Sequence, residues 1–190
     1  MLLFLIMNAE SNDVETMVSG SKAELFGRLY EQYLPRIFQY VSYRVGDRTT
    51  AEDLTSDIFN KALTNFTKYD SRKAAFSTWV FSIARNTLID YYRRRSREQK
   101  LQKEAESKAA IFSTSPEEEA SRSEEVRKLR KCLSLLNPNE REIISLKFSG
   151  EMTNREISQV TGLSESNVGT ILCRAVRKLR DEFTGWQNDR

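Results

Sequence analysis

Hydrophobic residues recur at helical spacing in three long segments of the N-terminal half. The first spans residues 23–45, and it contains Pro35, where we expect a kink or a break. The second spans residues 50–66, and the third spans residues 76–97. No run rich in β-branched residues competes with this pattern, so the sequence predicts that this half is helical.

Three shorter helices are predicted after position 136 from their start and stop signals. Asn137 and Thr153 are each followed three residues later by a glutamate, Glu140 and Glu156, which is the pattern of a capping box. Gly162 then provides the left-handed backbone conformation that a sharp turn needs. The last two of these helices therefore predict a helix-turn-helix.

The third of these helices begins after Ser164, and its two faces differ. Its apolar residues face inward, and between Ser166 and Arg180 it carries four basic residues and no acidic one. Short polar side chains near a helix N-terminus can bond base edges in the major groove, while later basic residues reach phosphates. The outward residues are Ser166, Asn167, Thr170, Arg174, Arg177 and Lys178. The alternative interpretation is an ordinary three-helix bundle with a solvated basic face.

Charge is distributed unevenly along the 190 residues, although the net charge is only +3. Residues 71–100 contain eight basic and two acidic side chains, whereas residues 101–126 contain three basic and seven acidic ones. This arrangement indicates a nucleic-acid-binding surface followed by a flexible tether that phosphate would repel.

Composition argues against most kinds of enzyme. Histidine is absent, which removes the commonest general base and metal ligand, and no glycine-rich phosphate loop is present. We therefore expect no enzymatic activity, no cofactor and no metal. Cys132 and Cys173 occupy apolar-looking helical positions, so we expect two buried, reduced thiols in a cytoplasmic protein. The apolar run from Met1 to Met7 is too short to span a bilayer, and translation could start at either methionine.

The start of the second helix is acidic. Glu52 and Asp53 could simply stabilise the helix dipole. Asp53, Asp57 and Asn60, however, share one side of the helix and could form a binding face for a partner protein. The sequence pattern alone leaves both interpretations open.

The third helix, residues 76–97, combines aromatic and basic residues on the face opposite its apolar stripe. We expect Phe81, Arg85 and Tyr92 on this face, which suits unstacked bases and single-stranded backbone. Asp90 falls among apolar residues, and a pair with Arg94 one turn later is the simplest explanation for it.

Three blocks of this sequence closely resemble bacterial RNA polymerase sigma factors. They are DLTSDIF at 53–59, FSTWVFSIARNTLIDYYRR at 76–94 and LNPNERE at 136–142. The resemblance is to the two-domain extracytoplasmic-function (ECF) group and extends over about residues 26–183. It implies an all-α fold of two small helical domains joined by a flexible linker, the C-terminal domain being a helix-turn-helix.

The resemblance also implies domain boundaries and partners. Residues 1–21 would be a flexible leader, 22–100 region 2, 101–122 an acidic linker toward the polymerase active-site channel, and 123–190 region 4. The partners would be promoter DNA and core RNA polymerase, through the clamp helices of its β′ subunit and through its β subunit. A separate anti-sigma factor would regulate a protein that does not insert into membranes.

The same resemblance assigns roles to individual residues. The polymerase-binding residues would be Glu52, Asp53, Asp57 and Asn60. The minus-ten element would be recognised and melted by Tyr69, Lys73, Trp79, Arg85, Asn86, Ile89, Tyr92 and Arg93. The minus-thirty-five element would be read by Ser166, Asn167, Thr170, Arg174, Arg177 and Lys178.

Two other functions are compatible with parts of the sequence. A helix-turn-helix regulator could bind duplex DNA without polymerase, but no heptad run or ligand domain supplies the dimer surface that it would need. A nucleic-acid-processing enzyme would need converging acidic metal ligands, for which Asp53 and Asp57 are the only close pair. The regulator would leave the Arg85 to Arg93 face and the acidic second helix unexplained, and for the enzyme two carboxylates one helical turn apart are more often a solvated or docking face.

Overall fold

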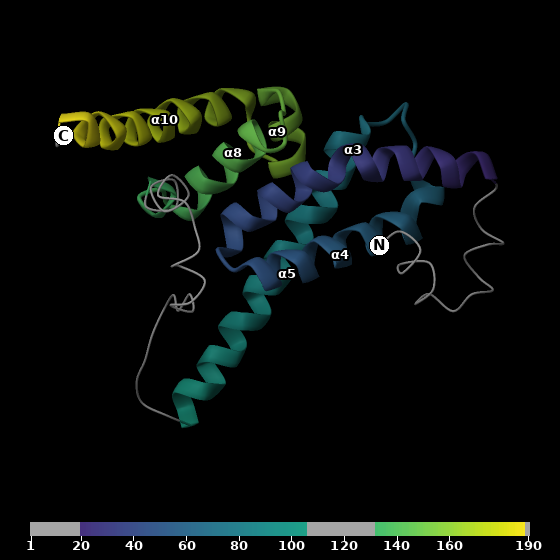
Figure 1. Ribbon diagram of the computed structural model, residues 1–190, viewed down its shortest axis with the longest axis horizontal. Helices are drawn as coiled ribbons and strands as arrows, with labels where there is room; N and C mark the ends of the chain where they lie inside the picture. The colour runs from purple at the N-terminus through teal and green to yellow at the C-terminus, as the bar shows by residue number, and fades with distance from the viewer. Residues whose placement is uncertain (1–19, 106–131, 189–190) are drawn as a thin grey trace.

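The computed structural model describes residues 20–105 and 132–188, and every regular element within them is helical (Figure 1). The prediction of an all-α fold is therefore confirmed. The leader up to residue 19 and residues 106–131 of the linker and the second domain lie outside the described residues. The elements are α3 (Gly20–Val45), α4 (Arg48–Asn65), the 3₁₀ turn η1 (Phe66–Lys68), α5 (Phe76–Ala105), α8 (Pro138–Phe148), α9 (Asn154–Thr161) and α10 (Glu165–Asn188).

The N-terminal unit consists of α3, α4, η1 and α5 packed around a core rich in aromatic rings. Tyr40 of α3 and Phe81 of α5 are fully buried and meet edge to face, with ring centroids 5.4 Å apart. The expected break at Pro35 is wrong, because α3 continues through it. Pro35 lies on the exposed side of the helix, where water can bond the carbonyl that loses its partner.

The C-terminal unit consists of α8, α9 and α10, and its predicted caps are present. The side chains of Asn137 and Thr153 each accept a hydrogen bond from the backbone N–H of the glutamate three residues later. Each glutamate bonds back to the cap, which completes two capping boxes. Gly162 ends α9 with φ +77°, in the left-handed region, so the chain turns directly into α10.

The two units pack against each other along a continuous interface, although the resemblance implied two domains joined by a flexible linker. Helix α9 lies against α5, and α8 lies against α3. A single hydrophobic core extends across the contact, and its C-terminal members include Ile143, Leu146, Ile157 and Val168. Helix α5 runs past position 100 to Ala105, so the first residues of the predicted linker are helical (Figure 1).

Two predictions about side chains of α5 are wrong. Phe81 does not face solvent but is completely buried. The ion-pair partner of Asp90 is Arg93, with 2.8 Å between Nη2 and Oδ1, and not Arg94. The first error arises because α5 is buried on more than one side, by α3, by α4 and by α9.

Candidate nucleic-acid interfaces

The outer face of α10 presents a row of exposed polar and basic side chains. Val168 and Ala175 are fully buried on the inner face and hold the helix against the rest of the C-terminal unit. The Ser164 hydroxyl accepts a hydrogen bond from the N–H of Asn167 at 3.2 Å and so caps the helix start. The exposed residues of the predicted reading face are Ser166, Asn167, Thr170, Arg174, Arg177 and Lys178.

The turn between α9 and α10 is fixed by short-range hydrogen bonds. The Ser158 hydroxyl donates to the carbonyl oxygen of Leu163 at 2.6 Å, and the N–H of Gly162 donates to the Ser158 carbonyl at 2.8 Å. The N–H of Leu163 is bonded to the Thr161 hydroxyl at 3.3 Å. These contacts set the direction in which α10 leaves the turn, as a recognition helix requires.

Lys178 is a predicted reading residue whose side chain is bound to another helix. Its Nζ lies 2.8 Å from both carboxylate oxygens of Glu140, the glutamate of the first capping box. Burial by itself raises the pKa of Glu140, but the Lys178 ammonium and the Asn137 N–H outweigh it and lower that pKa below its usual value. Lys178 therefore ties α10 to the start of α8.

Cys173 also lies on the exposed side of α10, whereas Cys132 is buried. The expectation of two buried thiols is therefore wrong for Cys173. Cys173 follows Thr170 by three residues and precedes Arg177 by four, so helical periodicity puts it on the outer face, and the expectation followed the apolar character of the residue instead.

The acidic side of α4 carries its own cations. Glu52 accepts a hydrogen bond from Arg48 at 2.8 Å, and Asp57 accepts one from Lys61 at 2.7 Å, both across one helical turn. Asp53 and Asn60 are exposed. The face is thus solvent-accessible and of mixed charge, and its exposed ion pairs contribute little to stability.

An aromatic cluster supports the loop between η1 and α5. The Tyr69 ring lies 5.0 Å from Trp79 and 5.5 Å from Phe76, and its hydroxyl donates to the Ala74 carbonyl at 3.2 Å. Burial raises the pKa of Tyr69, so the ring remains uncharged. Lys73 is exposed at the tip of this loop. The loop is held open by rings that could stack on a base.

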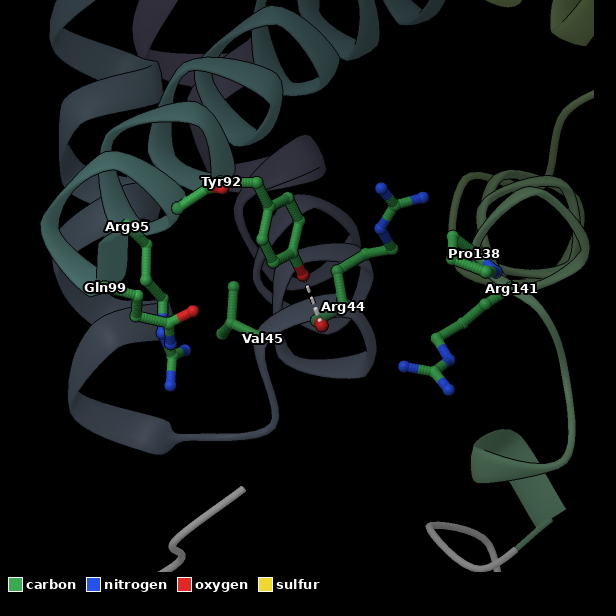
Figure 2. A pocket seen from close by; sticks show the side chains of 8 residues that line it. Arg44, Val45, Tyr92, Arg95, Gln99, Pro138 and Arg141 are labelled. Atoms are coloured by element: carbon green, nitrogen blue, oxygen red, sulfur yellow. Dashed lines mark hydrogen bonds between the residues drawn. The ribbon is translucent and has the colours of Figure 1, made fainter. Parts of the chain in front are cut away.

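On α5, the predicted minus-ten residues differ in their accessibility. Asn86, Ile89 and Arg93 are exposed. Tyr92 is half-buried, and its hydroxyl donates to the Arg44 carbonyl at 2.6 Å (Figure 2). Burial raises the pKa of Tyr92 as well.

Arg85 lies at the contact between the two units. Its Nε is 3.3 Å from Oε1 of Glu142 on α8, and the same oxygen is 3.4 Å from Nη1 of Arg44 on α3. Only 12% of the Glu142 side chain is exposed. One buried carboxylate therefore lies between two guanidinium groups of the other unit.

Three further polar contacts join the units. Arg36 of α3 donates to the Gly150 carbonyl and pairs with Glu151 at 3.7 Å, and the Ser77 hydroxyl donates to Glu156 at 3.1 Å. Sequence reasoning missed these residues because they join positions more than 70 apart in the chain. No local pattern indicates a contact of this kind.

The described part of the chain offers neither a metal site nor a membrane-spanning helix. Residues 20–105 and 132–188 contain no group of three or more His, Cys, Asp or Glu side chains that could hold a metal ion. Among the described helices, none is long and apolar enough to cross a membrane. The exposed features of α4, α5 and α10 therefore remain the candidate sites.

Comparison with known proteins gives matches over both units. The family model for sigma-70 region 2 matches residues 29–98, and the model for sigma-70 region 4 matches residues 127–179. The chain is 31% identical to the ECF RNA polymerase sigma factor BldN of Streptomyces coelicolor, over 90% of this chain and 65% of BldN. It is also 31% identical to the RNA polymerase sigma factor YlaC of Bacillus subtilis, over 82% of this chain and 90% of YlaC.

The fold is also similar to a solved structure. The sigma factor RpoE of Bartonella quintana, crystallised with the anti-sigma factor NepR, superposes with a TM-score of 0.70 at 19% identity. The match covers 85% of this chain and 98% of that chain. At this identity the likeness concerns the fold alone.

Proposed function

Since the chain belongs to the RNA polymerase sigma factors of the ECF group, we propose that it binds core RNA polymerase and directs promoter-specific transcription initiation. The observation that carries this proposal is the presence of both sigma-70 regions in one chain, each with the exposed residues that its task needs. The role is one of recognition and positioning in the cytoplasm, not enzymatic catalysis.

Helix α10 is the proposed reader of the minus-thirty-five element. Ser166, Asn167 and Thr170 lie in its first two turns and are exposed, as base contacts in the major groove require. Arg174 and Arg177 follow one and two turns later, where they reach base edges or phosphates. Lys178 contributes to phosphate binding only to the extent that its bond to Glu140 leaves its charge available.

The N-terminal unit is the proposed site of minus-ten recognition and melting. The aromatic cluster around Tyr69 and Trp79 offers ring faces for a flipped base, and Lys73 lies beside it for the backbone. Strand opening then follows from capture of unpaired bases and needs no nucleotide hydrolysis. The proposed contacts continue along α5 through Arg85, Asn86, Ile89, Tyr92 and Arg93.

Helix α4 is the proposed docking surface for the polymerase. Its exposed residues Asp53 and Asn60 would contact the clamp helices of the β′ subunit directly. Glu52 and Asp57 would exchange their intrahelical partners for cations of the polymerase, at little cost because both pairs are exposed. The second unit would lie on the β subunit.

The packed arrangement of the two units has to change when the protein acts. Arg85 is paired with Glu142 and is only partly accessible, so the minus-ten face becomes complete when α8 moves away. Core polymerase would hold the two units apart at the spacing of the two promoter elements. A separate anti-sigma factor would instead favour the packed arrangement of the two units, and a stress signal would release this factor.

Run-off transcription with purified core RNA polymerase, with and without this chain, tests the proposal. The template is a pool of promoter fragments whose transcript starts are sequenced. New starts that share two upstream elements at a fixed spacing are the expected result. If no transcript appears while the protein alone binds duplex DNA with sequence preference, a polymerase-independent helix-turn-helix regulator is the correct function.

A further inference from the structure

A cavity of about 500 Å³ lies between the two units, at the C-terminal end of α3 (Figure 2). Its walls come from both units. The C-terminal end of α3 and residues 92–99 of α5 form one side, and the start of α8 forms the other. The residues that decide its chemistry are Arg44, Tyr92, Arg95, Gln99, Pro138 and Arg141. No residue of this group was assigned to the polymerase, and only Tyr92 was assigned to DNA.

Three arginines, Arg44, Arg95 and Arg141, line this cavity, and Figure 2 shows that their guanidinium groups point in different directions. Arg44 shares the single carboxylate of Glu142 with Arg85. Among the described residues, the ion pairs include neither Arg95 nor Arg141. The cavity therefore carries an excess of positive charge that a bound anion would neutralise.

The contacts of the arginines leave donors available to a ligand. Arg141 donates to the carbonyl oxygens of Leu133 and Leu136 at 3.0 and 3.2 Å, which fixes the position of its guanidinium group. Nη1 of Arg44 is buried 3.4 Å from Glu142, so this atom belongs to that contact and not to the cavity. Arg95 is exposed, and its Nη1 donates to the Tyr91 hydroxyl at 3.1 Å, which leaves its other donors to a ligand. Burial, together with the charge of Arg44, lowers the pKa of Arg141, but a guanidinium keeps its proton.

We propose that this cavity binds a small anion that carries two or more adjacent phosphate groups, for which pyrophosphate is the simplest example. A guanidinium group presents a planar pair of donors that fits phosphate oxygens, and three such groups around one cavity suit a ligand with several charges. A single phosphate or carboxylate cannot neutralise all three arginines. The volume accommodates two linked phosphates and leaves room beside the Tyr92 ring for a nucleoside.

Such a ligand bridges the two units, because Arg44 and Arg95 belong to one and Arg141 to the other. Its binding therefore stabilises the packed arrangement. The effect of this stabilisation on promoter recognition rests on the proposed function, because Arg85, a proposed minus-ten residue, is paired with Glu142 in the packed arrangement. The binding itself does not, and it can be measured without polymerase or DNA.

Isothermal titration calorimetry of the full chain with pyrophosphate, in magnesium-free buffer at constant ionic strength, tests the proposal. The variant Arg95→Gln removes one cavity charge at a solvent-exposed position, where the side chain donates one exposed hydrogen bond, to the Tyr91 hydroxyl. The matched control is Arg97→Gln on the same helix, which does not line the cavity. We expect the dissociation constant to rise about tenfold for Arg95→Gln and to stay unchanged for Arg97→Gln.

Equal weakening by both variants would mean a diffuse attraction to the basic helix and would overturn the proposal, as would no heat with the unaltered chain. Orthophosphate binding as tightly as pyrophosphate would also overturn it.

The variant Arg141→Gln, checked for folding by circular dichroism, should weaken pyrophosphate binding from the other wall of the cavity. If this variant does not fold, the result for Arg95→Gln decides. If ADP binds more tightly than pyrophosphate, the ligand is a nucleotide. If ADP binds more weakly than pyrophosphate, the ligand is a free polyphosphate. Displacement of pyrophosphate by a short single-stranded oligonucleotide at equal phosphate concentration would identify a nucleic-acid contact instead.

Discussion

At the scale of single residues, Glu140 shows how one side chain serves two parts of the fold. It closes the capping box at the start of α8 and binds Lys178 of α10. The sequence indicated the first contact, because a capping box needs residues only three positions apart. The second joins residues 38 positions apart, and no local pattern predicts it.

Replacing Glu140 with glutamine should lower the free energy of unfolding by about 2 kcal/mol at pH 7, because a buried charge-assisted contact is lost. The pKa of Glu140 is lowered in the folded state, so its contribution is present above its unfolded pKa of about 4 and is lost as pH falls. Urea unfolding should therefore show a large difference between the two proteins at pH 7 and a small one at pH 3. Glu165→Gln, exposed at the start of α10, is the control and should change little.

Arg174→Ala should weaken recognition of the minus-thirty-five element by about 1–3 kcal/mol without affecting the fold, because Arg174 is exposed. The measurement is transcription from promoters that differ only in that element. We expect Arg174→Ala to lose the difference in transcription between these promoters. If Arg174→Ala discriminates as well as the unaltered chain, α10 does not read bases through this residue.

Asp57→Arg should reduce affinity for core polymerase, because it reverses a charge on the proposed docking face of α4. Lys61 then loses its carboxylate partner, keeps its hydrogen bond to the Thr87 hydroxyl and faces a like charge, but both side chains of the pair are partly exposed, so the fold should survive. The control is Ser56→Arg, which adds a cation at the adjacent exposed position, about a quarter-turn away. Equal loss of polymerase binding in both variants would point to net charge and not to this face.

At the scale of elements, the sequence predicted what depends on neighbours along the chain. Both capping boxes and the left-handed turn at Gly162 were confirmed, since each is specified within a few residues. The errors occurred where tertiary contacts decide the outcome. Phe81 was assigned to the outer face because a single apolar stripe was assumed, whereas α5 is covered on more than one side and Phe81 packs against Tyr40 of α3.

Gly162→Ala should destabilise the C-terminal unit by about 1–2 kcal/mol, because a left-handed backbone is unfavourable for any residue with a Cβ. No atom lies within 4 Å of the position that the new Cβ would occupy, so steric contact adds nothing. Gly27→Ala in the middle of α3 is the matched control, with equally open space. It should stabilise by up to about 1 kcal/mol, since alanine favours a helix. Thermal unfolding that moved both variants in the same direction would contradict this account.

At the scale of the whole molecule, the candidate surfaces were predictable but their arrangement was not. Each sigma-70 region has its own sequence signals, and these indicated α4, α5 and α10. The contact between the units depends on a shared apolar core and on Glu142, Glu151 and Glu156, and no local sequence pattern indicates the contacts of these glutamates with the other unit. The sequence therefore specified two units without showing how they pack.

Glu142→Gln should separate the two units. The substitution removes a buried charge between Arg44 and Arg85 and leaves both guanidinium groups without their carboxylate, which in buried pairs costs about 3–5 kcal/mol. Glu151→Gln removes an exposed carboxylate from the same interface, where an ion pair is worth at most about 1 kcal/mol. Small-angle X-ray scattering should show a larger radius of gyration for Glu142→Gln and no change for Glu151→Gln. An unchanged radius for Glu142→Gln, with helix content preserved, would mean that the shared apolar core alone holds the units together, and that Arg85 is not restrained by its carboxylate.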